Sequence, residues 1–453
     1  GGRGAWPTWP VAERIRAVEN FLFRMQERRD EIVRLLMWEV GKSLKDSRKE
    51  FDRTAQYVRD TIDALKELDR VSSRFAIEEH VIAQIRRAPL GVVLCMGPFN
   101  YPLNETFTTL IPALIMGNTV VLKPPKMGVL LWRPLLEAFR DAFPRGVVNT
   151  IYGDAPTIVG PIMASGRIDV LAFIGSSRVA DLLRRQHPQP HRMRAVLSLE
   201  AKNAAVILPD ADLPLTVEEC LTGTLSFNGQ RCTALKLIFV HERIREAFLD
   251  EFLRGLARLS WGMPWEDDVA ITPLPDPGKP LYLSGLIEDA VGQGARVLNA
   301  WGGEVHGSFF TPAALFPVTP GMRVHREEQF GPVIPVVGFD HADEAVNAIA
   351  ASNYGQQVSL FGRDEAALAG LIDVMVNQVC RVNLNSQCQR GPDVFPFTGR
   401  KDSAEGTLSV SDALRVFSIR TLVAARDVAV NKEIITGIVR GRRSNFLSTD
   451  FLL

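Results

Sequence analysis

The sequence predicts an α/β protein in which a mainly parallel sheet carries helices on both faces. From residue 91 to about residue 208, β-rich segments alternate with segments of helical periodicity. A second alternating region runs from about residue 209 to residue 410. The chain has 453 residues and is 46% hydrophobic, which is enough to build the cores of two or three domains. In such folds, ligands bind outside the carboxyl ends of the parallel strands.

The predicted elements follow one another along the chain. Residues 10–68 are expected to be helical, because apolar positions such as Val11, Ile15 and Val18 recur at helical spacing. Residues 75–95 alternate in polarity, and their polar first part predicts a hairpin that projects from the core. The strands expected in the first region are Gly91–Met96, Thr119–Leu122, Val147–Tyr152, Val170–Ile174, Ala195–Leu199 and Ala204–Leu208. The expected helices include Leu130–Phe143, Val179–Gln186, Ile244–Leu256 and Ala342–Ala350, and a last strand, Thr421–Ala425, precedes an unexplained tail.

Composition narrows the class of protein. Lys+Arg and Asp+Glu balance at 52 each, so net charge gives no reason to expect a nucleic-acid partner. Five cysteines, odd in number and without CxxC spacing, favour reduced thiols and a cytoplasmic location. The histidines form no HExxH motif, so no metal site is predicted, and no apolar run is long enough to predict a membrane helix. The chain opens abruptly at GGRGAWPTWP, and we expect a native front segment, with any targeting sequence, to be missing.

The stretch LSFNGQRCTAL, residues 225–235, contains the candidate nucleophile. An isolated cysteine is more often a packed small side chain than a reactive group. Cys232, however, follows a polar turn formed by Gly229, Gln230 and Arg231. The adjacent Arg231 is expected to lower the pKa of the Cys232 thiol, and the thiolate is the reactive species.

Two further motifs follow strands of the first region. In MGPFNYPLNE, residues 96–105, two prolines fix the backbone around Asn100, whose side-chain N–H can stabilise a developing oxyanion. In VVLKPPK, residues 120–126, Lys123 and Lys126 flank a rigid Pro-Pro, with no carboxylate nearby in the sequence. This pattern favours a ribose that bears a 2′-phosphate, and a solvated lysine pair is the simpler interpretation of the same residues. For Asn100, the simpler interpretation is an ordinary asparagine in a turn.

Two weaker motifs complete the set. In FIGSSRVADLL, residues 173–183, Gly175 and Ser176 separate a strand from a helix start that suits a pyrophosphate, but the GxGxxG pattern is absent. In REEQFGPVIPV, residues 326–336, Glu328 can hold ribose hydroxyls and Phe330 can pack on a nicotinamide ring. Taken alone, this last segment is equally well explained as a loop with a hydrophobic anchor.

Together, in this order and spacing, PFNYPLN, GNTVVLKPP, FIGSS, FNGQRCTA and EEQFGPV resemble the motifs of the aldehyde dehydrogenase superfamily over essentially the whole chain. The finer similarity is to the NADP-dependent non-phosphorylating glyceraldehyde-3-phosphate dehydrogenases. It is carried by Tyr101 after Asn100, Arg231 before Cys232, KPPK, and the segment SQCQRGPDVFPFTGRKDS at 386–403.

The resemblance implies a Rossmann-type NADP-binding domain at residues 1–73 and 91–208, and an α/β catalytic domain at residues 209–410. A hairpin at residues 74–90, with a strand and tail at residues 411–453, would serve in oligomerisation to a dimer or tetramer. The implied reaction oxidises glyceraldehyde 3-phosphate, or a similar phosphorylated aldehyde, to the acid while NADP is reduced, through a thioester that water hydrolyses.

The resemblance also assigns roles to residues. Cys232 attacks the aldehyde, and the oxyanion is held by the Asn100 side chain and the Cys232 backbone N–H. The cofactor would contact Lys123, Lys126, Gly175, Ser176, Glu328 and Phe330. The substrate phosphate would contact Tyr101, Arg231, Thr233, Arg390 and Arg53, because guanidinium forks grip phosphate oxygens.

One motif departs from the family. The general base belongs to an ELGGK segment, which here reads LSLEAK at residues 197–202, with Ser198 at the glutamate position. If this segment is extended, Ser198 and Glu200 share one face, so we expect Glu200 to act as the base. The loss of the usual glutamate leaves two alternatives open: an enzyme that transfers the acyl group to coenzyme A, or an inactive relative with a structural or binding role.

Overall fold

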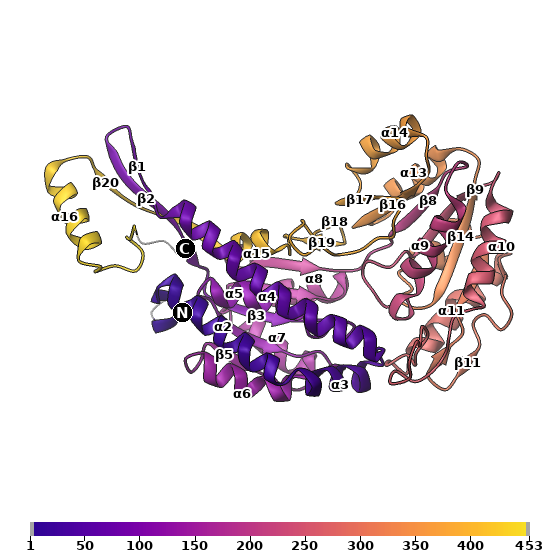
Figure 1. Cartoon of the computed structure of the whole chain (residues 1–453), viewed down its shortest axis with the longest axis horizontal. Helices are drawn as coiled ribbons and strands as arrows, with labels where there is room; N and C mark the ends of the chain where they lie inside the picture. The colour runs from indigo at the N-terminus through magenta and orange to yellow at the C-terminus, as the bar shows by residue number, and fades with distance from the viewer. Residues whose placement is uncertain (1–3, 450–453) are drawn as a thin grey trace.

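The computed structural model describes residues 4–449 and arranges them as two α/β units and a projecting arm (Figure 1). The first unit is built on a six-stranded sheet of order β19-β7-β6-β3-β4-β5, in which all neighbours are parallel except β19 and β7. We call it the first sheet. Its strands are β3 (Val92–Met96), β4 (Thr119–Lys123), β5 (Val148–Thr150), β6 (Val170–Ile174), β7 (Arg194–Ser198) and β19 (Ala404–Glu405).

Helices cover both faces of the first sheet, as the alternating pattern predicts. The four N-terminal helices are α1 (Ala5–Thr8), α2 (Val11–Glu27), α3 (Arg29–Val40) and α4 (Leu44–Ser72). They share one core with α5 (Asn104–Ile115) and α6 (Trp132–Ala142), through side chains such as Phe21, Phe107 and Phe139. The opposite face is covered by α7 (Ala155–Ala164) and α8 (Ser177–Gln186), which bury Met163 and Leu183 against it.

The second unit is built on a seven-stranded sheet of order β10-β13-β14-β9-β8-β16-β17, which we call the second sheet. Its strands are β8 (Ala204–Ile207), β9 (Leu237–His241), β10 (Arg296–Val297), β13 (Ala313–Phe316), β14 (Val333–Phe339), β16 (Gln357–Phe361) and β17 (Arg381–Leu384). The helices α9 (Leu213–Leu225) and α10 (Arg245–Leu256) pack on one face, and α13 (Ala342–Ala351) and α14 (Glu365–Met375) pack on the other. The remaining elements are α11 (Lys279–Gly292), α12 (Arg323–Arg326), β11 (Val305–His306), β12 (Phe309–Phe310), β15 (Tyr354–Gly355) and β18 (Arg400–Lys401).

Two expected boundaries differ in the structure. The strand expected at Ala204–Leu208 forms, but as β8 it pairs with β9 and β16 of the second sheet, so the chain changes sheets between residues 198 and 204. Near the other boundary, β19 pairs with β7, and α15 (Val410–Val416) packs against α4 and α5. The physical reason is that strand propensity identifies a strand but does not choose its partner, which tertiary packing decides.

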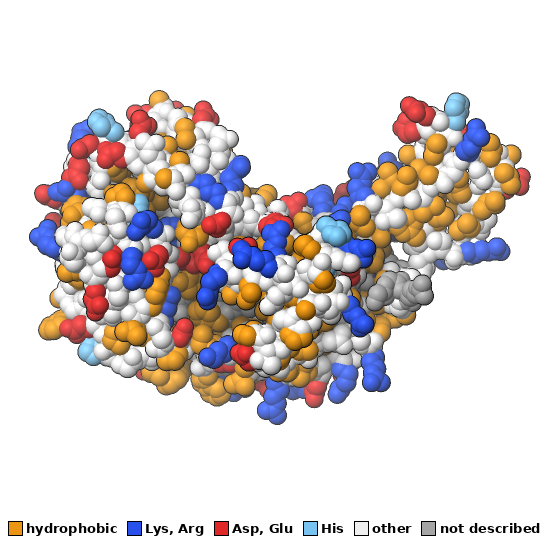
Figure 2. Space-filling model, turned by 180° about the vertical axis from the view of Figure 1, so that it is seen from behind, with side chains coloured by type: hydrophobic (Ala, Val, Ile, Leu, Met, Phe, Trp, Pro, Cys, Tyr) orange, Lys and Arg blue, Asp and Glu red, His pale blue; other side chains and the backbone are white. Residues whose placement is uncertain are grey.

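The arm consists of β1 (Phe75–Glu78), β2 (Val81–Pro89) and β20 (Ser418–Arg426), and it projects from the first unit (Figure 1). Glu79 and His80 turn the hairpin with φ angles of 45° and 66°, as a two-residue turn between antiparallel strands requires. Apolar side chains are exposed along it, as the orange surface in Figure 2 shows; among them are Ile77, Val81, Ile85, Leu422 and Val423.

The tail contains a helix that the sequence did not predict, α16 (Ala429–Arg440), which lies along the arm (Figure 1). Beyond it the chain returns to the hairpin, where the Gln84 side chain donates a 2.6 Å hydrogen bond to the Ser448 carbonyl. The tail up to residue 449 is therefore ordered against its own chain, and residues 450–453, which belong to the expected tail, lie outside the described residues. Within the described part, no helix is long and apolar enough to span a bilayer.

Candidate active site

Two cavities meet between the two units. The large cavity, of about 960 Å³, lies outside the carboxyl ends of β3, β4, β6 and β7, and residues of the second unit close its other side. The small cavity, of about 360 Å³, lies between α4, the start of α5, the end of α9 and the segment 387–391. Cys232 lines both cavities, so the thiol lies where they join.

A strained turn positions Cys232. Phe227 and Asn228 have φ angles of 50° and 55°, and Gly229 has a φ of 70°. The Asn228 side chain accepts from the Thr272 N–H and donates to the Thr272 carbonyl, which holds the turn in place. A side chain at position 229 is excluded, because its Cβ would lie 2.7 Å from the Thr224 carbonyl oxygen and 2.9 Å from that of Gly331. Backbone strain of this kind is found at functional sites.

The environment of the thiol differs from the expected one. Burial, and after it the Glu105 carboxylate, raise the pKa of Cys232 to about 11, against the opposing effects of Lys236 and Arg390. The expectation that Arg231 lowers this pKa is wrong: its guanidinium turns away and donates to the carbonyls of Thr222 and Gly223. Adjacency in sequence therefore did not place the charge beside the sulfur.

The backbone around Cys232 is firmly held. Its carbonyl accepts hydrogen bonds from the Asn203 side chain, at 2.8 Å, and from Lys236 Nζ, at 3.0 Å. In the part of the chain that the structure describes, the Cys232 N–H has no acceptor, which leaves this donor available to a ligand.

Asn100 enters the large cavity from the loop after β3. Its side-chain amide donates to the Gln230 carbonyl at 2.8 Å, which uses one of its two hydrogens and orients the amide beside the Cys232 loop. The loop is anchored by Lys42, which donates to the Asn100 carbonyl at 2.7 Å and forms a fully buried ion pair with Glu50. Glu50 in turn accepts from the N–H groups of Leu103 and Asn104 at the start of α5. The oxyanion position proposed for Asn100 is thus preorganised.

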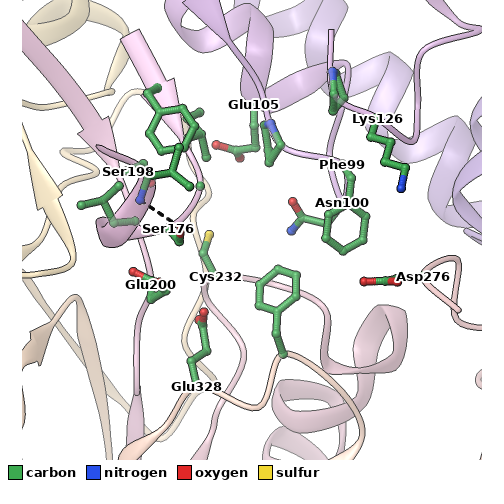
Figure 3. A pocket seen from close by; sticks show the side chains of 18 of the residues that line it. Phe99, Asn100, Glu105, Lys126, Ser176, Ser198, Glu200, Cys232, Asp276 and Glu328 are labelled. Atoms are coloured by element: carbon green, nitrogen blue, oxygen red, sulfur yellow. Dashed lines mark hydrogen bonds between the residues drawn. The ribbon is translucent and has the colours of Figure 1, made fainter. Parts of the chain in front are cut away.

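The large cavity contains all but one of the expected cofactor residues. Lys126, Gly175, Ser176, Glu328 and Phe330 line it (Figure 3 labels Lys126, Ser176 and Glu328). Ser176 caps α8 by accepting from the Val179 N–H. Lys123 does not line it: this side chain is buried at the end of β4, where desolvation lowers its pKa.

Glu328 already has partners inside the protein. Its Oε1 accepts from the Ala201 N–H at 3.0 Å and forms an ion pair with the buried Lys236. Because Lys236 also contacts the Cys232 carbonyl, one lysine joins the nucleophile loop to the loop that carries Glu328. Phe330 packs against Phe99 with a ring separation of 5.9 Å, and both rings line the large cavity.

Glu200 also lies in the large cavity, on the same wall as Ser198, as expected for an extended segment (Figure 3). Its Oε2, however, accepts a 2.8 Å hydrogen bond from the Ser177 N–H at the N-terminus of α8. A carboxylate is stabilised there by the helix dipole. The carboxylates that raise the pKa of the Cys232 thiol are those of Glu105 and Glu328.

The small cavity brings together all five expected substrate residues: Arg53, Tyr101, Arg231, Thr233 and Arg390. Two of its arginines are already paired. Arg53 donates two 2.7 Å hydrogen bonds to the Asp393 carboxylate, and the buried Arg390 pairs with Glu105 and, at 3.2 Å, with Asp393. In the part of the chain that the structure describes, no carboxylate pairs with Arg231.

Sequence reasoning missed the residues that hold this site together. Lys42 and Glu50 lie within a helical region, where a polar pair is usually a solvated one. Lys236 follows Cys232 by four residues inside an apolar run, and a lysine at the edge of a buried strand could have marked it. Glu105 stands inside the motif MGPFNYPLNE and was not singled out, because an acid at the first turn of a helix is common.

A two-unit α/β fold with a strained cysteine loop beside a cavity of dinucleotide size defines a class of enzyme that works through a thiol and a bound nucleotide. The family model for the aldehyde dehydrogenase family matches residues 2–422. The chain is 33% identical to an NADP-dependent glyceraldehyde-3-phosphate dehydrogenase from Streptococcus equinus over 420 residues, covering 91% of this chain and 86% of that protein. It is 31% identical to the corresponding protein of Pisum sativum over 427 residues, covering 92% and 84%.

A solved structure agrees. The crystal structure of NADP-dependent glyceraldehyde-3-phosphate dehydrogenase from Bacillus halodurans, complexed with NADP, superposes with a TM-score of 0.87 at 33% identity, covering 93% of this chain and 88% of that one. The chain therefore belongs to the aldehyde dehydrogenase family.

Proposed function

We propose that the protein oxidises glyceraldehyde 3-phosphate, or a similar phosphorylated aldehyde, to the acid, with NADP as the oxidant and a thioester on Cys232 as the intermediate. One observation carries the proposal: Cys232 lies at the junction of a cavity large enough for a dinucleotide and a smaller cavity that contains arginines. A thiol at that junction would attack an aldehyde in the small cavity and face an oxidant in the large one. The named relatives, which act with NADP on this phosphorylated aldehyde, support the assignment.

The residues of the large cavity fit NADP. Bound NADP would supply the hydride acceptor. Lys126 is exposed at the cavity wall, where its ammonium group would meet a 2′-phosphate, and Gly175 and Ser176 lie beside the N-terminus of α8. Glu328 and Phe330 would flank the nicotinamide end, close to the Cys232 loop.

Cys232 and Asn100 would carry the acyl chemistry. The thiol loses its proton to solvent, and the sulfur then forms a bond to the aldehyde carbon while the C=O π pair moves to the oxygen; the resulting oxyanion is held by the Asn100 amide and the Cys232 N–H. The Asn100 amide is held by its hydrogen bond to the Gln230 carbonyl, and the Cys232 backbone is held by the bonds that its carbonyl accepts from Asn203 and Lys236, so both donors would need little rearrangement to receive the charge. Arg231 would bind the substrate phosphate together with Tyr101 and Thr233, since no carboxylate of the described residues pairs with its guanidinium.

The test is a steady-state assay with glyceraldehyde 3-phosphate and either NADP or NAD, with and without coenzyme A. The proposal expects 3-phosphoglycerate and NADPH as products, faster turnover with NADP, and no acyl-coenzyme A. Acyl-coenzyme A as the main product would establish the transferase alternative. A protein that binds NADP but consumes none of the aldehyde would be an inactive relative, and the proposal would be wrong.

We also propose that the arm joins subunits. Its three strands expose apolar side chains on a projecting element, a surface that is costly to leave in water. Sedimentation velocity on the whole chain should give a dimer or tetramer, and a monomer at micromolar concentration would contradict this proposal.

A further inference from the structure

The junction of the two cavities contains one ionisable side chain besides the nucleophile. Of the described residues, Glu105 and Cys232 are the two that line both the large and the small cavity. Figure 3 shows the Glu105 carboxylate and the Cys232 sulfur projecting into the same space, from α5 and from the loop before β9. An aldehyde bound to the sulfur would therefore have this carboxylate beside it.

Glu105 is held in place on one side and open on the other. It lies in the first turn of α5, where the helix dipole stabilises a carboxylate, and it is 5% exposed. Its Oε2 pairs with Arg390. In the described part of the chain, no protein donor reaches its Oε1, so this oxygen is left to accept from a water molecule in the cavity.

Ser198, which stands at the position of the family's usual base, cannot act as a base. Ser198 is 3% exposed and lies in β7, where it is paired with β6 and β19. A hydroxyl is a poor base at neutral pH. Glu200, the acid that the sequence suggested, is engaged by the Ser177 N–H at α8 and does not line the small cavity. Glu328 pairs with Lys236 and with the Ala201 N–H and does not line the small cavity, so Glu105 is the carboxylate left beside Cys232 where the two cavities join.

We propose that Glu105 is the general base that hydrolyses the Cys232 thioester, and that Arg390 is its positioning residue rather than a direct ligand of the substrate phosphate. This inference rests on the proposed function. In the step, Glu105 takes a proton from water while the water oxygen bonds to the acyl carbon. The tetrahedral oxyanion then collapses, the carbon–sulfur bond breaks, and the electron pair leaves with the Cys232 thiolate. The acid product departs, and Glu105 releases its proton to solvent.

The contacts of the Arg390 guanidinium support its role in positioning Glu105. Its Nη1 pairs with Glu105, its Nε donates to Asp393 at 3.2 Å, and its Nη2 donates to the Leu408 carbonyl at 3.2 Å. The guanidinium also lies 4.4 Å from the centre of the Phe397 ring. A group fixed by four contacts sets the direction of its carboxylate partner, whereas it has few donors left for a phosphate.

The experiment compares Glu105→Gln with Glu200→Gln in rapid mixing of enzyme, NADP and glyceraldehyde 3-phosphate. Glutamine keeps the shape of the side chain and removes the base. We expect E105Q to release a burst of about one NADPH per active site and then to turn over about 100-fold more slowly than the wild type. Intact-mass spectrometry should detect the acyl adduct on Cys232. Hydroxylamine, which needs no base to attack a thioester, should restore turnover. E200Q should accumulate no acyl adduct on Cys232, and Glu67→Gln, at an exposed acid on α4 that lines neither cavity, is the matched control and should keep the wild-type steady state.

Other outcomes separate the two proposals. A wild type that yields NADPH, together with an E105Q variant whose steady state is unchanged, overturns the role of Glu105 and leaves the proposed function intact. A stalled acyl-enzyme in E200Q alone would transfer the role to Glu200. A wild type that yields no NADPH overturns the proposed function itself. If E105Q fails to fold, Glu105→Asp keeps the ion pair but withdraws the carboxylate, and it should show the same burst with slower turnover.

Discussion

The two cavities handle charge in opposite ways. The large cavity is lined mainly by apolar side chains, and Lys126 stands at its wall without a recorded carboxylate partner among the described residues. In the small cavity, Arg53 and Arg390 are each neutralised by Asp393 or Glu105. Lys126 is therefore available to meet one phosphate of a ligand, although Glu200, Asp276 and Glu328 line the same cavity, whereas the small cavity is nearly balanced before any substrate binds. Arg53 and Arg390 therefore hold the carboxylates of Asp393 and Glu105 in place and offer little free positive charge to a substrate.

The largest effect should come from the atom that joins the cavities. Cys232→Ala removes the nucleophile, and we expect kcat to fall by at least about 10⁴-fold, because the covalent route is lost. NADP binding in the large cavity, followed by fluorescence titration, should be unchanged. Cys380→Ala, at a half-buried cysteine away from both cavities, is the matched control and should keep full activity.

The next effect would test whether the arginines of the small cavity are structural. Arg390→Met leaves the buried Glu105 without its ion-pair partner, while Asp393 keeps Arg53, and the change should destabilise the protein by about 3–5 kcal/mol. Urea unfolding, followed by tryptophan fluorescence, measures the shift. Arg231→Met, which breaks no ion pair, should cost much less stability and raise KM for the phosphorylated aldehyde. Equal destabilisation by the two changes would mean that the contrast between them is wrong.

A smaller effect would test the free charge of the large cavity. Lys126→Met removes a cation that is proposed to meet the 2′-phosphate, and KM for NADP should rise about tenfold with little change in kcat. NAD lacks that phosphate, so its KM serves as the internal control and should stay constant. A parallel rise in both KM values would place Lys126 elsewhere on the cofactor.

The smallest effect concerns the charge on the thiol. Burial raises the pKa of Cys232 to about 11, so the neutral thiol is favoured and the thiolate fraction grows as pH increases toward that value. The rate of alkylation by iodoacetamide should therefore rise about tenfold per pH unit from pH 7 to pH 9.5. In E105Q the loss of a nearby negative charge should move this profile to lower pH. A plateau below pH 8 in the wild type would show that the thiol is already ionised.

Much of the fold followed from periodicity. The five parallel strands of the first sheet and the helices α6, α8, α10 and α13 lie within a few residues of their expected limits, because buried parallel strands and amphipathic helices leave strong patterns, whereas the short antiparallel strand β19 was not predicted. Strand partners did not follow, as β8 shows, since pairing depends on packing distant in sequence. The helix α16 was missed because it buries no residue, and it therefore lacks a core-facing stripe.

The site was predictable where a residue stands in a motif and unpredictable where it acts through a partner. Cys232, Asn100, Tyr101, Arg231, Thr233 and Arg390 stand in quoted motifs, Arg53 was expected only from the family resemblance, and all of them line one or other of the two cavities. Their roles remain predictions. The pairing of Arg390 with Glu105 joins residues 285 positions apart, and the burial that raises the thiol pKa arises from the whole fold. Neither is visible in a local stretch of sequence.

The contact at Gly229 has a consequence for how this enzyme can diversify. The main chain of the nucleophile turn touches the main chain at Gly331, with no room for a side chain between them. The spacing between the Cys232 turn and the loop that carries Glu328 and Phe330 is consequently set by peptide atoms that no substitution alters. Selection can exchange the side chains that line the small cavity while this spacing keeps its width.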